Sequence, residues 1–208
     1  MLRNFHGRWI AIEGTSPVLS RRHRFLAPKS RKIRIKMFGA PIDEQTVDLG
    51  DWIDRRWHAE RCIRARPDSV SPHWQMLARS IQFSEAADWL SVARLFAPLY
   101  GTDDVPEALQ DEARRILEQY PTDSKARAMA ILHALQGRVR YLALALGEGG
   151  FIPRALGEVW ESGYGDCKDS ARLFVALARL VGFEAVPALI TTGFGPALDT
   201  FSPQRDGV

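Results

Sequence analysis

The pattern of apolar and polar positions divides the chain into two parts. Up to about residue 80, apolar and polar residues alternate in short runs, most clearly at 7–14 and 31–38, and prolines separate the runs. Alternation with a period of two is typical of strands that bury one face and expose the other. The first part therefore predicts short strands and loops of a β-rich domain.

From residue 84 onward the apolar spacing becomes helical. Ser84 is the expected cap of the first helix, and Thr122 or Asp123 caps the third, which is expected to continue through Gly137. Glycines at 163 and 182 are expected to end the last two helices. The predicted helices are 84–100, 105–120, 122–146, 154–161 and 167–182. Residues 184–192 have the composition of a strand, and residues 193–208 are predicted to be a loop.

Composition narrows the class of protein. The 208 residues are 46% hydrophobic and 25% charged, which fits a globular chain and excludes disordered and fibrous classes. No apolar run is long enough to span a bilayer, and the first residues lack a signal peptide, so no membrane span is expected. The two cysteines, Cys62 and Cys167, are too few for a disulfide scaffold. Localisation stays open.

Most of the excess positive charge lies between Arg21 and Lys36, where eight Lys or Arg residues occur without an acid. Such a run could bind nucleic acid or anionic lipid. However, its last three basic residues alternate with Ile33 and Ile35, which favours a solvated strand. Nucleic-acid binding is therefore the weakest of the functional hypotheses.

The stretch 163–170, GYGDCKDS, carries the clearest chemistry. If Asp166 is an N-cap, Cys167 is the first helical residue and Asp169 completes a capping box. The positive end of the helix dipole favours a thiolate at that position, although flanking carboxylates oppose it. A cysteine at a helix start can equally be a small packing residue. Both readings of Cys167 stay open at this point.

No metal or cofactor is predicted. His58 and Cys62 could share a metal only if their segment were helical, and two ligands do not make a zinc site.

The run from Arg138 to Ile190, with YGDCKD at 164–169, resembles bacterial transglutaminase-like proteins of the papain-like cysteine superfamily. In these proteins a β-rich domain of unknown function precedes the core, and RFLAPKS at 24–30 looks like the end of that domain. The resemblance implies an α+β protein. Residues 1–80 would be the C-terminal part of the β-rich domain, and 84–208 would be the helical half of a transglutaminase-like core.

The resemblance also assigns roles to residues around the cysteine. Cys167 matches the nucleophile of an acyl transfer at an amide, with a peptide or protein as substrate. Gly165, Asp166 and Asp169 would support the helix N-terminus. Tyr164 and Trp160 are candidates for the oxyanion site or the substrate groove.

The chain departs from the family in its histidines. All five precede Cys167, whereas the family places its catalytic histidine and aspartate on later strands. Neither Asp199 nor Asp206 can be matched to the family acid, and His133, on an apolar helix, is not favoured as a base. We therefore expect a chain truncated at both ends that is inactive alone. The alternative is a non-catalytic protein- or peptide-binding module in which Cys167 is structural.

Truncation would also expose apolar surface. Without a covering sheet, Leu173, Leu177 and Leu180 on the helix 167–182 should be partly exposed. Poor solubility and self-association are the expected consequences.

Overall fold

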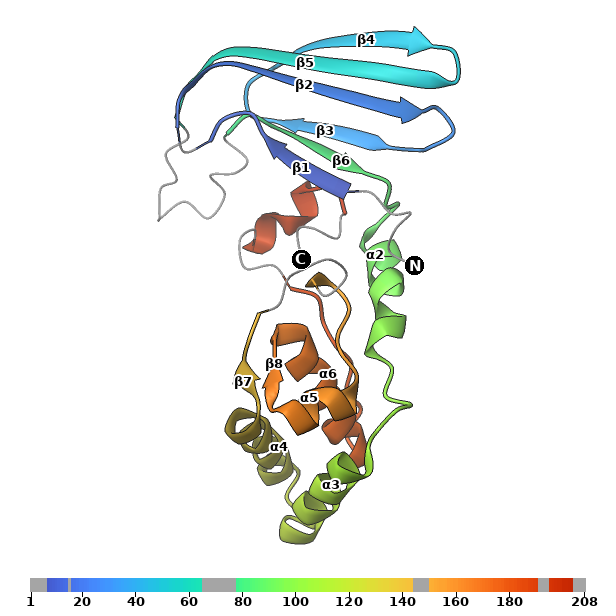
Figure 1. Ribbon diagram of the computed structural model, residues 1–208, viewed down its shortest axis with the longest axis vertical. Coiled ribbons are helices and arrows are strands. Elements are labelled where there is room, and N and C mark those ends of the chain that lie inside the picture. The colour runs from blue at the N-terminus through green and yellow to red at the C-terminus, as the bar shows by residue number, and fades with distance from the viewer. Residues whose placement is uncertain (1–6, 15, 65–77, 144–149, 191–194, 204–208) are drawn as a thin grey trace. The chain divides into compact units, whose positions relative to one another are not determined.

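The computed structural model describes residues 7–14, 16–64, 78–143, 150–190 and 195–203, which form strands in the first part of the chain and helices in the second (Figure 1). The predicted α+β class is confirmed. Contacts divide the chain into a β unit, residues 1–95 with 189–208, and a helical unit, residues 96–188. That residues 1–80 end a β-rich domain of unknown function stays a prediction. No helix among the described residues is both long and apolar enough to cross a membrane.

The β unit contains two antiparallel sheets of three strands each. In one sheet β6 lies between β1 and β3, and in the other β5 lies between β2 and β4. The strands are β1 (Gly7–Ala11), β2 (Val18–Pro28), β3 (Arg34–Phe38), β4 (Asp43–Leu49), β5 (Trp52–Cys62) and β6 (Ser80–Ser84). The alternating runs at 7–14 and 31–38 are thus confirmed as containing strands.

One apolar core joins the two sheets. Phe83 on β6 stacks on Phe25 of β2 with ring centroids 4.6 Å apart, and it meets the edge of Trp57 on β5 at 5.5 Å. Ile81, on the same face of β6, is fully buried in this core. Side chains from both sheets therefore interdigitate as in a sandwich.

The opposite face of β6 is polar and is covered by the end of the chain. Gln82 is fully buried, and its side-chain amide exchanges two hydrogen bonds with the backbone of Ser202, at 2.7 and 2.8 Å. Phe201 packs on Phe38 of β3 at 4.8 Å. The segment predicted to be a loop includes a short 3-10 helix, Gly195–Thr200. This packing explains why residues after 188 belong to the β unit.

The basic run from Arg21 to Lys36 is divided between β2 and β3. On β3 Ile35 is partly buried while Arg34 and Lys36 are exposed, so the predicted solvated strand is confirmed. Several of the charges have intramolecular partners: Arg24 pairs with Asp54, Lys29 with Asp48 and Arg31 with Glu85. These pairs leave less free charge than the sequence suggests.

The helices begin close to the predicted positions, with one wrong cap. Ser84 ends strand β6, and the first described helix is instead capped by Asp88, whose carboxylate accepts a hydrogen bond from the Ser91 amide at 2.6 Å. The helices are α2 (Trp89–Phe96), the 3-10 helix Ala97–Tyr100, α3 (Glu107–Gln119), α4 (Ser124–Arg138), α5 (Leu156–Ser162) and α6 (Cys167–Leu180).

Two predictions of secondary structure in the second part are wrong. The helix expected at 122–146 ends at Arg138, because the next residues form a short parallel strand, β7 (Arg140–Tyr141), that pairs with β8 (Tyr164–Gly165). The strand expected at 184–192 is not formed at 184–190, and the remainder lies outside the described residues. No described strand pairs with residues 184–190, so the β propensity of this segment is not realised.

The helical unit has its own core, and this overturns the predicted exposure of α6. Leu173 and Leu177 are fully buried against α3, α4 and α5, whereas Leu180 is 36% exposed. The buried partners are Leu109, Ala113 and Ile116 on α3, Ile131 and Leu135 on α4, and Leu156 and Val159 on α5. The three preceding helices, rather than a sheet, cover the apolar face of α6.

Candidate active site

Cys167 is the first residue of α6, and its side chain is exposed. The predicted capping box is confirmed. Asp166 accepts hydrogen bonds from the amides of Lys168 at 3.1 Å and Asp169 at 3.3 Å, and the Asp169 carboxylate accepts one from the Asp166 amide at 3.2 Å. The thiol is thus presented at a firmly capped helix N-terminus, where the helix dipole favours negative charge.

Both carboxylates beside Cys167 are paired with cations. Asp166 forms an ion pair with Lys168, and each of these side chains is only 10% exposed. Asp169, which is 3% exposed, accepts hydrogen bonds from the Arg154 amide at 2.9 Å and from the Arg154 Nε at 3.2 Å. The carboxylates therefore oppose a thiolate less than the bare sequence suggests.

Arg154 connects the segments around the cysteine. Besides Asp169, its guanidinium binds the carbonyl of Tyr164 and the carboxylate of Glu158, and its own carbonyl accepts a hydrogen bond from Arg172 at 2.9 Å. No sequence signal identifies this residue, because its partners are up to 18 positions away. Arg154 fixes the backbone that leads into α6.

The two-residue strands β7 and β8 hold the chain just before Cys167. The Arg140 amide donates to the Gly163 carbonyl at 2.8 Å, and the Leu142 amide donates to the Gly165 carbonyl at 2.9 Å. Gly163 ends α5 with a φ of +68°, a left-handed conformation that favours glycine. Gly165 is buried where β8 approaches α5 and α6 closely.

A side chain at Gly165 would disrupt this approach. A Cβ there would lie 3.0 Å from Val159 Cγ1 and 3.1 Å from Asp169 Cβ. We expect Gly165→Ala to destabilise the helical unit by about 1–3 kcal/mol through overpacking. Gly137→Ala on α4, where a Cβ meets nothing within 4 Å, should stabilise by about 0.5–1 kcal/mol. Urea unfolding followed by far-UV circular dichroism compares the two, and equal effects would contradict the close packing at Gly165.

Tyr100 is a residue near the site that the sequence does not reveal. It is 8% exposed, and burial raises the pKa of its phenol, with further contributions from the charges of Cys167, Asp166 and Asp169. Its hydroxyl group therefore stays protonated close to the start of α6. Sequence spacing could not find it, because 67 positions separate it from Cys167.

The remaining sequence candidates fall into different surroundings. Tyr164 is 48% exposed, three residues before Cys167. Trp160, by contrast, is 5% exposed in the helical core, and the Arg138 guanidinium stacks 4.5 Å from its ring centroid. Packing accounts for Trp160, so we do not place it in a substrate groove.

Among the described residues of the β unit, Cys62, His23 and His58 form no metal site. His58 and Cys62 lie on strand β5, where a spacing of four residues places side chains too far apart to share an ion. Within the described residues no group of three or more metal-ligating side chains occurs.

No histidine among the described residues is hydrogen-bonded to Cys167. His133 is exposed on α4, and His23 and His58 lie on strands of the β unit. His6, His73 and Asp206 lie outside the described residues. The described part of the site therefore contains a candidate nucleophile without an identified base.

A hollow of about 300 Å³ lies between α4 and α6. On α6 it is lined by Ser170, Ala171 and Phe174, which follow Cys167 at the spacing of one helix face. Leu132 and Leu135 supply apolar side chains from α4. The exposed thiol and this apolar hollow thus lie along the same face of α6.

Comparison with known proteins identified one family model and one solved structure that resemble this chain. Residues 110–199, which include α6, match the family model described as the transglutaminase-like superfamily. The chain is also similar to the crystal structure of "a putative protease" from Parabacteroides distasonis ATCC 8503, with a TM-score of 0.70 and 12% sequence identity. That match covers 84% of this chain and 34% of the other, so this chain corresponds to about a third of that protein's length. No curated protein matches the sequence significantly.

Proposed function

We propose that Cys167 is the nucleophile of a cysteine-dependent acyl transfer or amide hydrolysis, because residues 110–199 match the family model of the transglutaminase-like superfamily. The observation that carries the proposal is an exposed thiol at the first position of α6, with both neighbouring carboxylates neutralised by Lys168 and Arg154. The match to the superfamily model alone would not select this residue.

The chemistry is attack of the Cys167 thiolate on the carbonyl carbon of an amide. The C–N bond breaks, the amine leaves with a proton, and the acyl group stays on sulfur as a thioester until water or a second amine accepts it. Among the first amides of α6, those of Lys168 and Asp169 are bound by Asp166, while the Cys167 amide has no acceptor in the described chain. That amide is available to stabilise the oxyanion.

The substrate we propose is a peptide or protein amide. The hollow beside Ser170, Ala171 and Phe174 can accommodate an apolar part of such a substrate. Since no described histidine contacts Cys167, we expect the isolated chain to form covalent adducts but to turn over amides poorly. General base catalysis typically contributes about 10²–10⁴-fold.

Alkylation tests the proposed nucleophile directly. We expect iodoacetamide to modify Cys167 at least about tenfold faster than Cys62, which is 1% exposed and donates a hydrogen bond to the Ala59 carbonyl. Mass spectrometry of tryptic peptides measures both rates in one sample. Cys167→Ala should abolish the fast phase, and Cys62→Ala should leave it unchanged.

The second candidate function is a non-catalytic protein- or peptide-binding module. It is favoured by the lack of a histidine hydrogen-bonded to Cys167 among the described residues. In that case Cys167 should react no faster than an exposed cysteine in a short peptide of the sequence 164–170. Such a rate would contradict an activated thiol and support the binding module.

A further inference from the structure

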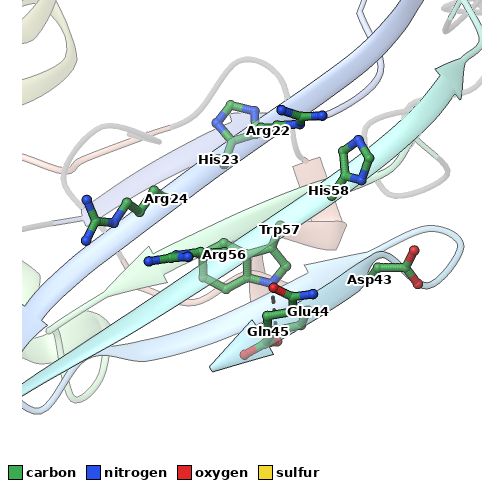
Figure 2. Close-up of a pocket in the computed structure, with 9 residues that line it drawn as sticks. All are labelled: Arg22, His23, Arg24, Asp43, Glu44, Gln45, Arg56, Trp57 and His58. Atoms are coloured by element: carbon green, nitrogen blue, oxygen red, sulfur yellow. Dashed lines mark hydrogen bonds between the residues drawn. The ribbon is translucent and has the colours of Figure 1, made fainter. Parts of the chain in front are cut away.

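A second hollow, of about 590 Å³, lies against the β2–β5–β4 sheet (Figure 2). Arg22 and Arg24 come from β2, Arg56 and His58 from β5, and Asp43 from β4. Its volume is in the range of sites for small molecules, and several polar groups converge on it. The hollow belongs to the β unit, whereas Cys167 belongs to the helical unit, so the two are separate sites.

Strand register places basic residues opposite one another here. Arg24 faces Arg56, and Arg22 faces His58, as neighbouring pairs on the same face of strands β2 and β5. Like charges at directly opposite positions destabilise an antiparallel pair. The two guanidinium groups of Arg24 and Arg56 therefore require a counter-charge.

The first pair has its counter-charge within the protein. Asp54 is fully buried, and its carboxylate accepts hydrogen bonds from Arg24 at 3.0 and 2.9 Å and from Arg56 at 3.1 and 2.6 Å. These hydrogen bonds lower the pKa of Asp54 to about 2, so the carboxylate is ionised at neutral pH. One negative charge thus holds two guanidinium groups in fixed positions.

In the second pair, Arg22 lacks such a partner. Arg22 is exposed and forms no ion pair with any described residue, while His58 lies 3.1 Å from Ser20 Oγ and 3.6 Å from Glu60. Burial lowers the pKa of His23, and the positive charge of Arg21 lowers it further. This neighbouring imidazole is therefore neutral at neutral pH and adds no charge.

The acids that line the hollow do not balance Arg22. Glu44 is already engaged, because it accepts hydrogen bonds from Trp57 Nε1 at 3.2 Å and from Arg55 at 3.1 Å. Asp43 lies opposite His58 on β4, whereas Arg22 lies opposite His58 on β2. Strand β5 therefore separates Asp43 from Arg22. The hollow therefore has a cationic side on β2 and an acidic group on β4.

From this arrangement we infer that the hollow binds the oxyanion of a ligand, a carboxylate or a phosphate. Arg22 supplies the principal contact, the outer N–H groups of Arg24 and Arg56 add to it, and Asp43 accepts a hydrogen bond from a donor elsewhere on the ligand. Guanidinium groups match the paired oxygens of carboxylates and phosphates. The ligand thus carries an acidic group with a hydroxyl or amine donor nearby.

The test is calorimetric titration of the full chain at low salt with two probes, inorganic phosphate and a tetraglutamate peptide blocked at both ends. We expect saturable binding of at least one probe, weakened about tenfold or more by Arg22→Gln. Cys167→Ala should have no effect.

Lys32→Gln is the matched control, since Lys32 is an exposed cation of the same basic run but does not line this hollow. Binding of phosphate alone identifies a phosphate-bearing ligand, and binding of the peptide alone identifies an acidic peptide; both outcomes support the site. Failure of both probes to bind overturns the proposal. Equal weakening by Arg22→Gln and Lys32→Gln overturns it as well, because only net charge would then matter.

Discussion

Replacement of Leu177 by alanine is expected to destabilise the helical unit by about 2–5 kcal/mol. Leu177 is fully buried in the core that α6 shares with α3, α4 and α5, so truncation leaves a cavity that the surrounding helices fill only partly. Urea unfolding followed by far-UV circular dichroism measures the loss, because α3 to α6 supply most of the helical signal of the described chain.

Leu180→Ala is the matched control on the same helix. Leu180 is 36% exposed, so its replacement by alanine should lower the free energy of unfolding by about 1 kcal/mol or less. Similar losses for the two variants would mean that α6 lacks the packing described above. The self-association expected from exposed leucines would then become relevant again.

Asp169→Asn is expected to destabilise the same unit by about 3 kcal/mol. The carboxylate is 3% exposed and accepts hydrogen bonds from the Asp166 amide, the Arg154 amide and Arg154 Nε. An asparagine keeps the shape of the side chain but removes the negative charge. The partly buried Arg154 guanidinium would thereby lose its buried counter-ion.

Asp111→Asn provides the control for charge alone. Asp111 pairs with Arg114 on the exposed surface of α3, where both side chains are well solvated. Such an exposed ion pair contributes little to stability, so Asp111→Asn should change the free energy of unfolding by no more than about 0.5 kcal/mol. If both aspartates tolerate the substitution equally, Asp169 does not organise the segment before Cys167.

The start of α6 could be predicted because its signals are local. Asp166 and Asp169 stand three residues apart, and a capping box needs only that spacing. The same holds for Gly163, whose left-handed conformation ends α5. The position of Cys167 at a helix N-terminus follows directly from these neighbours.

Features that depend on distant residues could not be predicted. The helix pattern continues past Arg138, but α4 stops there because β7 pairs with β8, more than twenty residues later. Arg154 and Tyr100 approach Cys167 only through the tertiary fold. The burial of Leu173 and Leu177 likewise depends on three earlier helices, whereas reasoning from the resemblance assigned that face to a sheet.

The charge pairing of the basic run likewise depends on residues that are distant in the sequence. Its sequence shows eight cations without an acid, but the fold brings Asp54, Asp48 and Glu85 to three of them from other strands and from beyond β6. That the positive charge of Arg22 has no acidic partner opposite it becomes apparent only once the register of β2 and β5 is known.

The most direct test of the central proposal is acylation of the chain by p-nitrophenyl acetate. Attack by the Cys167 thiolate breaks the ester C–O bond, releases p-nitrophenolate and leaves an acetyl thioester, a step that needs no base once the thiolate is formed. We expect one rapidly formed acetyl group on the tryptic peptide that contains Cys167, lost in Cys167→Ala and retained in Cys62→Ala. Acetylation confined to lysines, or an unchanged release of p-nitrophenolate by Cys167→Ala, would contradict it.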